Sequence, residues 1–305
     1  MRIGEDIKRR AIELDRHYRS TWDARAIAHV VGISSSTVAK ILREVRGPRP
    51  KRGKRQHARR TRFLKRDVMW SSDFVRLGWG WLLLKTIDER SGYILGWDLV
   101  RSESALALIG HAESILERMG RAPLVWKFDH GSAFMSEMFL GLLEHHEIVP
   151  YPIAPRSPWV NGRTERDHQE IHQWLIPLQG LPINREGLDR EIDECMLTRN
   201  YIKPRACLGF RRSAEVYFSE EEVLDPVGGM RSRLKQGICE AKNLEGVGEL
   251  ARAYTIEPSG ERAHRKAVRE VLQKLGLYEE WEVDVQGKPS GAGVVNRTGV
   301  ADVAF

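Results

Sequence analysis

The stretch VMWSSDFVRLGWGWLLLKTIDERSGYILGWDLV, at residues 68–100, decides the fold of this chain. It contains three short runs rich in aromatic and branched residues, separated by glycines and by Ser91. Runs of this composition bounded by turn residues are typical of β-strands. The sequence therefore predicts three consecutive antiparallel strands.

Towards the C-terminus, helices alternate with further strands. The run SALALIGHAESILERMG at 104–120 predicts an amphipathic helix that ends at a glycine, and PLVWKF at 123–128 predicts a fourth strand. A second helix is expected near 133–146, a fifth strand in HEIVPYPI, and a third helix after Asn161. This order predicts an α/β domain with a mixed sheet, as in the RNase H-like fold, at residues 67–218.

Towards the N-terminus, residues 1–46 predict a separate all-α domain. In DARAIAHVVGISSSTVAKILREV, Asp23 and Ser34 can each cap a helix and Gly32 permits the tight turn between them. Short helix, glycine turn and second helix form the helix-turn-helix pattern, although an ordinary helical hairpin has the same pattern. In a helix-turn-helix, the residues that reach DNA would be Ser35, Ser36, Thr37, Lys40 and Arg43.

Positive charge is concentrated at the same end of the chain. Residues 1–66 carry 20 Lys and Arg against 6 Asp and Glu, whereas the remainder has a net charge of −7. Residues 47–66 contain ten Lys and Arg and no acid. Because Lys and Arg displace counterions from phosphates, we interpret 47–66 as a basic linker along DNA rather than a solvated tail. The candidate phosphate contacts there are Arg52, Arg55, Arg59 and Arg60.

Composition excludes several other classes of protein. There is no run of about 18 apolar residues, and the first residues are charged, so neither a membrane span nor a signal peptide is expected. The three cysteines are widely spaced without a CxxC pair, which argues against a zinc cluster and a disulfide framework. We expect a cytoplasmic protein, associated with the nucleoid when it is bound to DNA.

Three carboxylates lie within or next to the predicted strands and helices of the α/β domain. Asp73 lies within the first strand, Asp129 just past the fourth, and Glu165 in the first turn of the third helix. Ligand groups converge where strand ends meet helix starts in an open α/β sheet. Hard divalent cations prefer oxygen ligands, so these three side chains are the candidate catalytic residues and ligands of two Mg²⁺ or Mn²⁺ ions.

The sequence blocks around these carboxylates resemble the signature blocks of the catalytic core shared by retroviral-type integrases and bacterial insertion-sequence transposases. The blocks are MWSSDFVRL, FDHGSAF and SPWVNGRTERDHQEIHQWL, and 35 residues separate Asp129 from Glu165, the interval characteristic of this family. RNYIKPRACLGFRRSAEVYF, at 199–218, is similar to the segment that follows the family's core. The resemblance implies a metal-dependent enzyme that cuts and joins DNA, acting as a homo-oligomer on element ends and target DNA.

The chain departs from the family pattern at several positions, including His130 in place of a frequent Asn and Asp167 in place of an aromatic residue. Because residues two apart do not share a helix face, we expect Asp167 to point away from the metals. On the same helix, His168, Gln169 and His172 share the face of Glu165 and are candidates to touch DNA, and Arg163 and Arg166 are candidate phosphate contacts.

Residues 219–305 lie outside the resemblance. They predict a helix near 260–275, a short strand in WEVDV and a Gly-rich tail. Recognition of element ends, oligomerisation and binding of a partner protein all remain open for this extension. Two other functions remain open for the whole chain: a DNA-binding regulator with an inactive integrase fold, and an RNase H-like nuclease that cuts without joining.

Overall fold

The computed structural model describes residues 4–47, 58–154, 162–220, 229–244 and 258–283. In chain order the elements are α1 (Glu5–His17), α2 (Ala24–Val31), α3 (Ser35–Arg46), β1 (Ala58–Phe63), β2 (Met69–Arg76), β3 (Leu82–Asp88), β4 (Ile94–Val100), α4 (Ala105–Met119), β5 (Val125–Phe128), α5 (Glu137–His145), β6 (Val149–Pro152), α6 (Gly162–Leu175), the 3₁₀ turn η2 (Ile176–Leu178), α7 (Arg185–Leu197), the π-helical turn η3 (Thr198–Ile202), the 3₁₀ turn η4 (Ala206–Leu208), α8 (Ser213–Tyr217), α9 (Met230–Leu244), α10 (Pro258–Lys274) and β7 (Tyr278–Val283). None of the helices in these ranges is long and apolar enough to cross a membrane.

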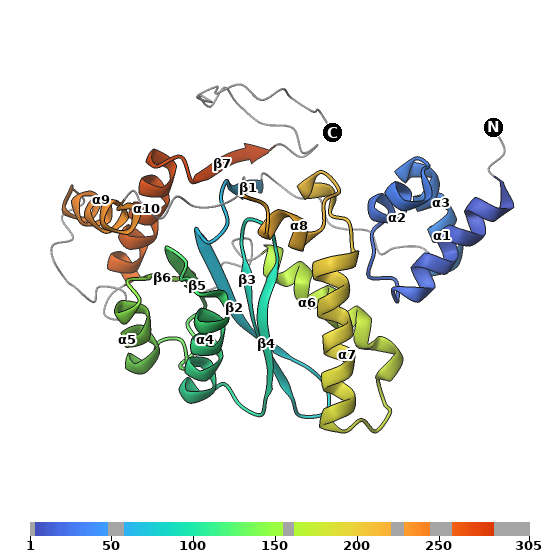
Figure 1. Cartoon of the computed structure of the whole chain (residues 1–305), viewed down its shortest axis with the longest axis horizontal. Coiled ribbons are helices and arrows are strands. Elements are labelled where there is room, and N and C mark those ends of the chain that lie inside the picture. The colour runs from blue at the N-terminus through green and yellow to red at the C-terminus, as the bar shows by residue number, and fades with distance from the viewer. Residues whose placement is uncertain (1–3, 48–57, 155–161, 221–228, 245–257, 284–305) are drawn as a thin grey trace.

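Helices α1, α2 and α3 form a small domain at one end of the molecule (Figure 1). The Asp23 side chain accepts a hydrogen bond from Ala26 N at 2.9 Å, and Ser34 accepts one from Thr37 N at 3.2 Å, so both expected caps are confirmed. Gly32 ends α2 with φ +74°, the left-handed conformation that the turn requires. The apolar core of this domain consists of Ala11, Trp22, Ala26, Ile27, Ala28, Val38 and Leu42.

The central sheet has the strand order β4-β3-β2-β5-β6. β2, β3 and β4 pair antiparallel, β5 runs parallel to β2, and β6 runs parallel to β5. Parallel neighbours need a crossover connection, and α4 and α5 supply the two that precede β5 and β6. The expected strands and mixed sheet are confirmed, and this arrangement is that of the RNase H-like fold.

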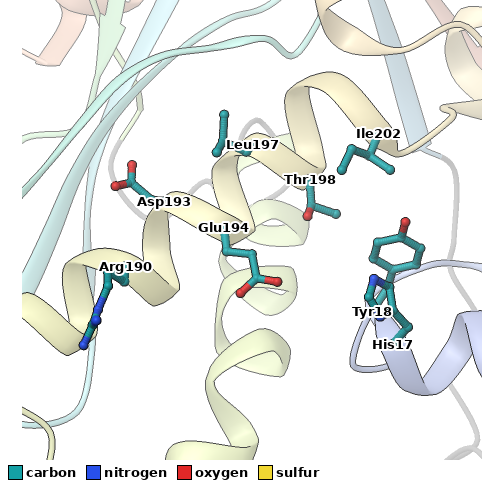
Figure 2. Close-up of a pocket in the computed structure, with 8 residues that line it drawn as sticks. All are labelled: His17, Tyr18, Arg190, Asp193, Glu194, Leu197, Thr198 and Ile202. Carbon is teal, nitrogen blue, oxygen red and sulfur yellow. The ribbon is translucent and has the colours of Figure 1, made fainter.

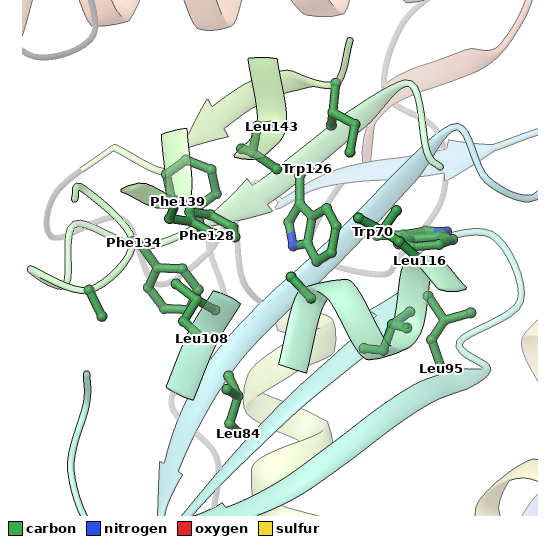
Figure 3. Close-up of a cluster of buried hydrophobic side chains, with 14 of the residues drawn as sticks. Trp70, Leu84, Leu95, Leu108, Leu116, Trp126, Phe128, Phe134, Phe139 and Leu143 are labelled. Atoms are coloured by element: carbon green, nitrogen blue, oxygen red, sulfur yellow. The ribbon is translucent and has the colours of Figure 1, made fainter. Parts of the chain in front are cut away.

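One face of the sheet packs against α4 and α5 through an aromatic core (Figure 3). Trp70 and Trp126 are fully buried there, with ring centroids 5.5 Å apart, and each indole N–H has a partner, Asp67 for Trp70 and Ser72 for Trp126. Buried indoles need such acceptors. Both tryptophans are therefore satisfied members of the apolar core.

The opposite face of the sheet packs against α6 and α7. Side chains alternate along a strand, so Asp73 shares this face with Val75, which packs in the same cluster as Ile171 and Trp174 of α6. Every residue of β3 is buried because the strand lies in the middle of the sheet and is covered on both faces. The sheet thus lies between two layers of helices, and Asp73 is on the face that packs against α6.

The described part of the C-terminal region packs on the core. Helices α9 and α10 cover the β5–β6 edge, where Leu234, Val268 and Leu272 join Val125 in a third apolar cluster. β7 pairs antiparallel with β1. β1 lies within residues 47–66, for which the sequence predicted a basic linker and no strand. The expected helix near 260–275 and the strand in WEVDV are present as α10 and β7.

Candidate active site

Asp73 lies within β2, whose backbone pairs with β3 on one side and β5 on the other. Its side chain is 19% exposed, so it is half-buried at the α6 face of the sheet. Its cross-strand partner in β3 is Lys85, a fully buried side chain. Asp73 itself pairs with Lys85, and the pairing of β2 with β5 ends two residues before it at Ser71, so the backbone that carries this carboxylate is held by the sheet.

Asp129 follows the last residue of β5, and its carboxylate accepts a hydrogen bond from Gly131 N at 2.8 Å. Ser71 of β2 lies opposite Lys127 of β5, so continuing this parallel register by two residues brings Asp73 beside Asp129. Partial burial and the negative charge of Asp73 raise the pKa of Asp129, and the Gly131 hydrogen bond opposes this rise. Two candidate ligands are thus close enough to repel each other.

Glu165 belongs to the first turn of α6, but its side chain lies outside the described residues, as does Asn161. Three residues further along this helix, the His168 imidazole Nε2 lies 3.2 Å from Asp73 Oδ2. The contact has no hydrogen-bond geometry, and this buried nitrogen has no hydrogen-bond partner among the described residues. The described side chains include no group of three His, Cys, Asp or Glu placed to hold a metal.

Asp167 points into the interior, where it is 2% exposed. It accepts a hydrogen bond from Arg199 at 2.5 Å and lies 3.7 Å from the Lys85 ammonium. Asp167 lies on the buried face of α6, beside the strand partner of Asp73. The expectation that it points away from the metals concerned the face of Glu165, whose side chain lies outside the described residues. No sequence motif singled out Lys85 or Arg199, although a lysine after three leucines in a strand was a signal.

A contact from α10 reaches the residue that follows Asp129. His130 Nε2 lies 2.9 Å from both carboxylate oxygens of Glu261, and Arg265 donates a hydrogen bond to the same carboxylate at 2.9 Å. Arg265 also donates to the carbonyl of Pro152 at the end of β6. The C-terminal region therefore contacts the turn that carries Asp129, which no sequence motif had indicated.

The expected DNA contacts of the helix-turn-helix domain lie at the start and outer face of α3. Ser35, Ser36, Lys40 and Arg43 are exposed and Thr37 is half-buried. The Ser34 hydroxyl hydrogen bonds to the hydroxyls of Ser36 and Thr37 at 2.9 and 2.8 Å. Elsewhere Arg60 in β1 and Arg166 in α6 are exposed, whereas Arg52 and Arg55 and the side chains of Arg59 and Arg163 lie outside the described residues.

A shallow cleft of about 350 Å³ lies between α1 and the α7–η3 region (Figure 2). Its lining side chains are His17, Tyr18, Arg190, Asp193, Glu194, Leu197, Thr198 and Ile202. Neither Asp73 nor Asp129 is among these side chains, so this cleft is separate from the surface between β2, β5 and α6 where those two carboxylates lie.

Comparison with known proteins gives a family match for the central part of the chain. Residues 65–158 match the model described as integrase core domain, a segment that contains Asp73 and Asp129 and ends before Glu165. No curated protein matches the chain.

Several solved structures are similar to the chain. The HTLV-2 integrase catalytic core domain in complex with magnesium is 20% identical over 52% of this chain and 99% of its own, with a TM-score of 0.40. The simian T-cell lymphotropic virus intasome in complex with PP2A regulatory subunit B56 gamma is 17% identical over 71% and 77%, with a TM-score of 0.47. The catalytic core domain of BIV integrase is 18% identical over 50% and 93%, with a TM-score of 0.42.

Proposed function

We propose that this chain, which carries an integrase core domain at residues 65–158, is a DNA transposase or integrase that cuts and joins strands at the ends of a mobile element. The observation that carries the proposal is the convergence of Asp73 and Asp129 on adjacent parallel strands, with α6 packed against the same face. Residues three apart lie on one side of a helix, so the His168 contact with Asp73 supports a place for Glu165 at the same site.

The residues at this site fit divalent metal ions. Partial burial and the charge of Asp73 raise the pKa of Asp129, and the His168 nitrogen beside Asp73 has no hydrogen-bond partner among the described residues. A divalent cation would relieve the repulsion between the two carboxylates. Asp73, Asp129 and Glu165 would hold two Mg²⁺ or Mn²⁺ ions. When bound, such ions activate an attacking oxygen and stabilise a leaving oxygen in an in-line displacement.

The protein's own contribution is to hold these ligands before DNA arrives. The pairing of β2 with β3 holds the backbone of Asp73, and the backbone N–H of Gly131 orients one oxygen of Asp129. The exposed Arg166 on α6 is placed to bind a phosphate as a two-pronged donor. Orientation of the ligands and of the DNA backbone then removes the need for rearrangement during the reaction.

Duplex DNA is the proposed partner. The exposed start of α3 would enter the major groove, with Lys40 and Arg43 near bases and phosphates, while the basic segment 47–66 adds affinity without sequence preference. One chain has one set of three carboxylates, whereas moving an element requires chemistry at two ends. The active form is therefore proposed to be a homo-oligomer on paired ends, which light scattering with and without end DNA can test.

The test separates binding, cleavage and joining on DNA that contains the sequences flanking the coding region. The proposal expects all three activities, with cleavage and joining dependent on Mg²⁺ or Mn²⁺. Binding without cleavage would identify a regulator with an inactive fold. Cleavage without joining would identify a nuclease, and either outcome would refute the proposed function.

A further inference from the structure

A cluster of charged side chains lies beneath α6, with Lys85, Asp167 and Arg199 buried and the other three members half-buried. Its members are Lys85 of β3, Asp167 and Glu170 of α6, Arg199 of η3, and Lys203 and Arg205, which follow η3. Lys85 and Arg199 are each 1% exposed. Charged side chains are almost never buried to this extent unless they are paired, so the cluster requires an explanation.

The contacts of the cluster join three segments that are distant in sequence. Asp167 contacts Arg199 at 2.5 Å and Lys85 at 3.7 Å. Glu170, one turn further along α6, lies 3.6 Å from Arg199 and forms an ion pair with Lys203. Two turns of α6 are thereby tied to the segment after α7 and to the middle of the sheet.

Opposite charges within the cluster counteract the effect of burial on Asp167 and Lys85. Burial alone would raise the pKa of Asp167, but the charges of Arg199 and Lys85 hold it well below its usual range. Burial lowers the pKa of Lys85, and the charges of Asp167 and Asp73 oppose that change. Asp73 is thus an electrostatic neighbour of the cluster as well as the cross-strand partner of Lys85.

The Lys85–Asp167 pair joins residues that neighbour two candidate metal ligands, Asp73 in the sheet and Glu165 in α6. Lys85 lies opposite Asp73, and Asp167 lies two residues after Glu165 in the same helix. The pair therefore links β3, the strand paired with that of the first candidate metal ligand, to the helix of the third. Apolar contacts alone would let α6 slide along the sheet, whereas an ion pair is satisfied at only one position of the helix.

We propose that Lys85, Asp167 and Arg199 are positioning residues, whose buried ion pairs fix α6 against β3, the partner strand of β2, so that Glu165 completes the metal site with Asp73 and Asp129. This inference rests on the proposed function, because it concerns the same three ligands. Lys203 also donates a hydrogen bond to the carbonyl of Thr21, just before α2, so the cluster extends to the helix-turn-helix domain.

The test measures Mn²⁺ binding to the full chain without DNA, by electron paramagnetic resonance of free Mn²⁺ during a titration. Two variants separate the effect of moving the Asp167 carboxylate from the effect of removing its charge. Lys85→Met/Asp167→Asn removes the pair while the net charge is unchanged, and Asp167→Glu keeps the charge but moves the carboxylate. Each is expected to weaken Mn²⁺ binding at least tenfold, as loss of a group that orients metal ligands typically does.

A matched control distinguishes positioning from general loss of stability. Asp15 in α1 is also a buried carboxylate, 1% exposed and paired with an arginine, Arg46, but it lies in the N-terminal domain. Asp15→Asn is expected to lower the thermal midpoint while Mn²⁺ affinity stays within twofold of wild type. Because Asp167→Glu leaves no buried charge without a partner, it remains informative if the double variant does not fold.

Glu165→Gln separates the two proposals. Unchanged Mn²⁺ binding in Glu165→Gln would overturn the proposed function, and the positioning inference with it. Weaker binding in Glu165→Gln together with wild-type affinity in both Asp167 variants would overturn the positioning inference alone. An equal loss of Mn²⁺ affinity in the Asp15→Asn control would also overturn the positioning inference, because weaker Mn²⁺ binding would then reflect a general loss of stability.

Discussion

His264 makes the attachment of α10 to the core sensitive to acid. The residue is 5% exposed, and its Nε2 lies 2.8 Å from the carbonyl oxygen of Pro150 on β6. Burial lowers the pKa of His264 to about 4, with smaller contributions in the same direction from Lys242 and Arg265, while the Pro150 contact opposes the change. The folded protein therefore resists protonation that the unfolded chain accepts.

The sign and size of the effect follow from this difference in pKa. Because the folded value lies below the ordinary 6.5, His264 contributes full stability above pH 6.5 and loses that contribution as the pH falls towards 4. A change of this size corresponds to about 3 kcal/mol of unfolding free energy. That is a large part of the stability of an ordinary domain.

The perturbation is His264→Gln, which keeps a donor for the Pro150 carbonyl but has no proton to gain. Urea unfolding of both proteins at pH 7.5 and pH 4 measures the change in unfolding free energy with acid. Wild type is expected to lose about 3 kcal/mol more than the variant, since carboxylates that titrate in both proteins cancel. Equal losses in the two proteins would refute the account of His264.

Three further predictions concern other parts of the molecule. Burial raises the pKa of Asp88 to about 6, so the stability contributed by its protonated form is lost as the pH rises through 6. Between pH 4 and 7.5, the unfolding free energy of Asp88→Asn measured in urea should therefore increase by about 3 kcal/mol relative to that of wild type. Lys40→Ala or Arg43→Ala should weaken duplex binding and reduce the slope of affinity against salt by about 1, and an unchanged slope would exclude that phosphate contact. Glu261→Ala should lower the joining rate at least about tenfold by freeing His130, whereas Glu270→Ala, an exposed position on the same helix, should not.

The sequence predicted the elements whose signals are local. Asp23 and Ser34 cap helices through side chains that bond three residues along, and the strands of the sheet contain short runs of apolar residues, such as the three leucines that begin β3. The carboxylates Asp73 and Asp129 were predicted by their positions in these elements, and the sheet register places them together. Short-range geometry is thus sufficient for these features.

The features that the sequence analysis missed depend on partners far away along the chain. β1 has the sequence ARRTRF, which lacks apolar alternation, and it forms a strand because it pairs with the acidic β7, with Arg62 lying 3.1 Å from Glu279. From the sequence alone, Arg199 would be taken for a surface charge, because its partner Asp167 lies in α6, a separate helix. The contact between His130 and Glu261 joins residues 131 positions apart, so no local pattern predicts it.

The most direct test of the central claim is a joining assay with Mg²⁺, in which a labelled DNA end is linked covalently to plasmid DNA. Asp129→Asn is compared with Asp98→Asn, which neutralises a 55% exposed carboxylate on β4, the edge strand of the same sheet. The account predicts that Asp129→Asn abolishes joining while duplex binding stays near wild type, and that Asp98→Asn still joins ends. Undiminished joining by Asp129→Asn would contradict the account.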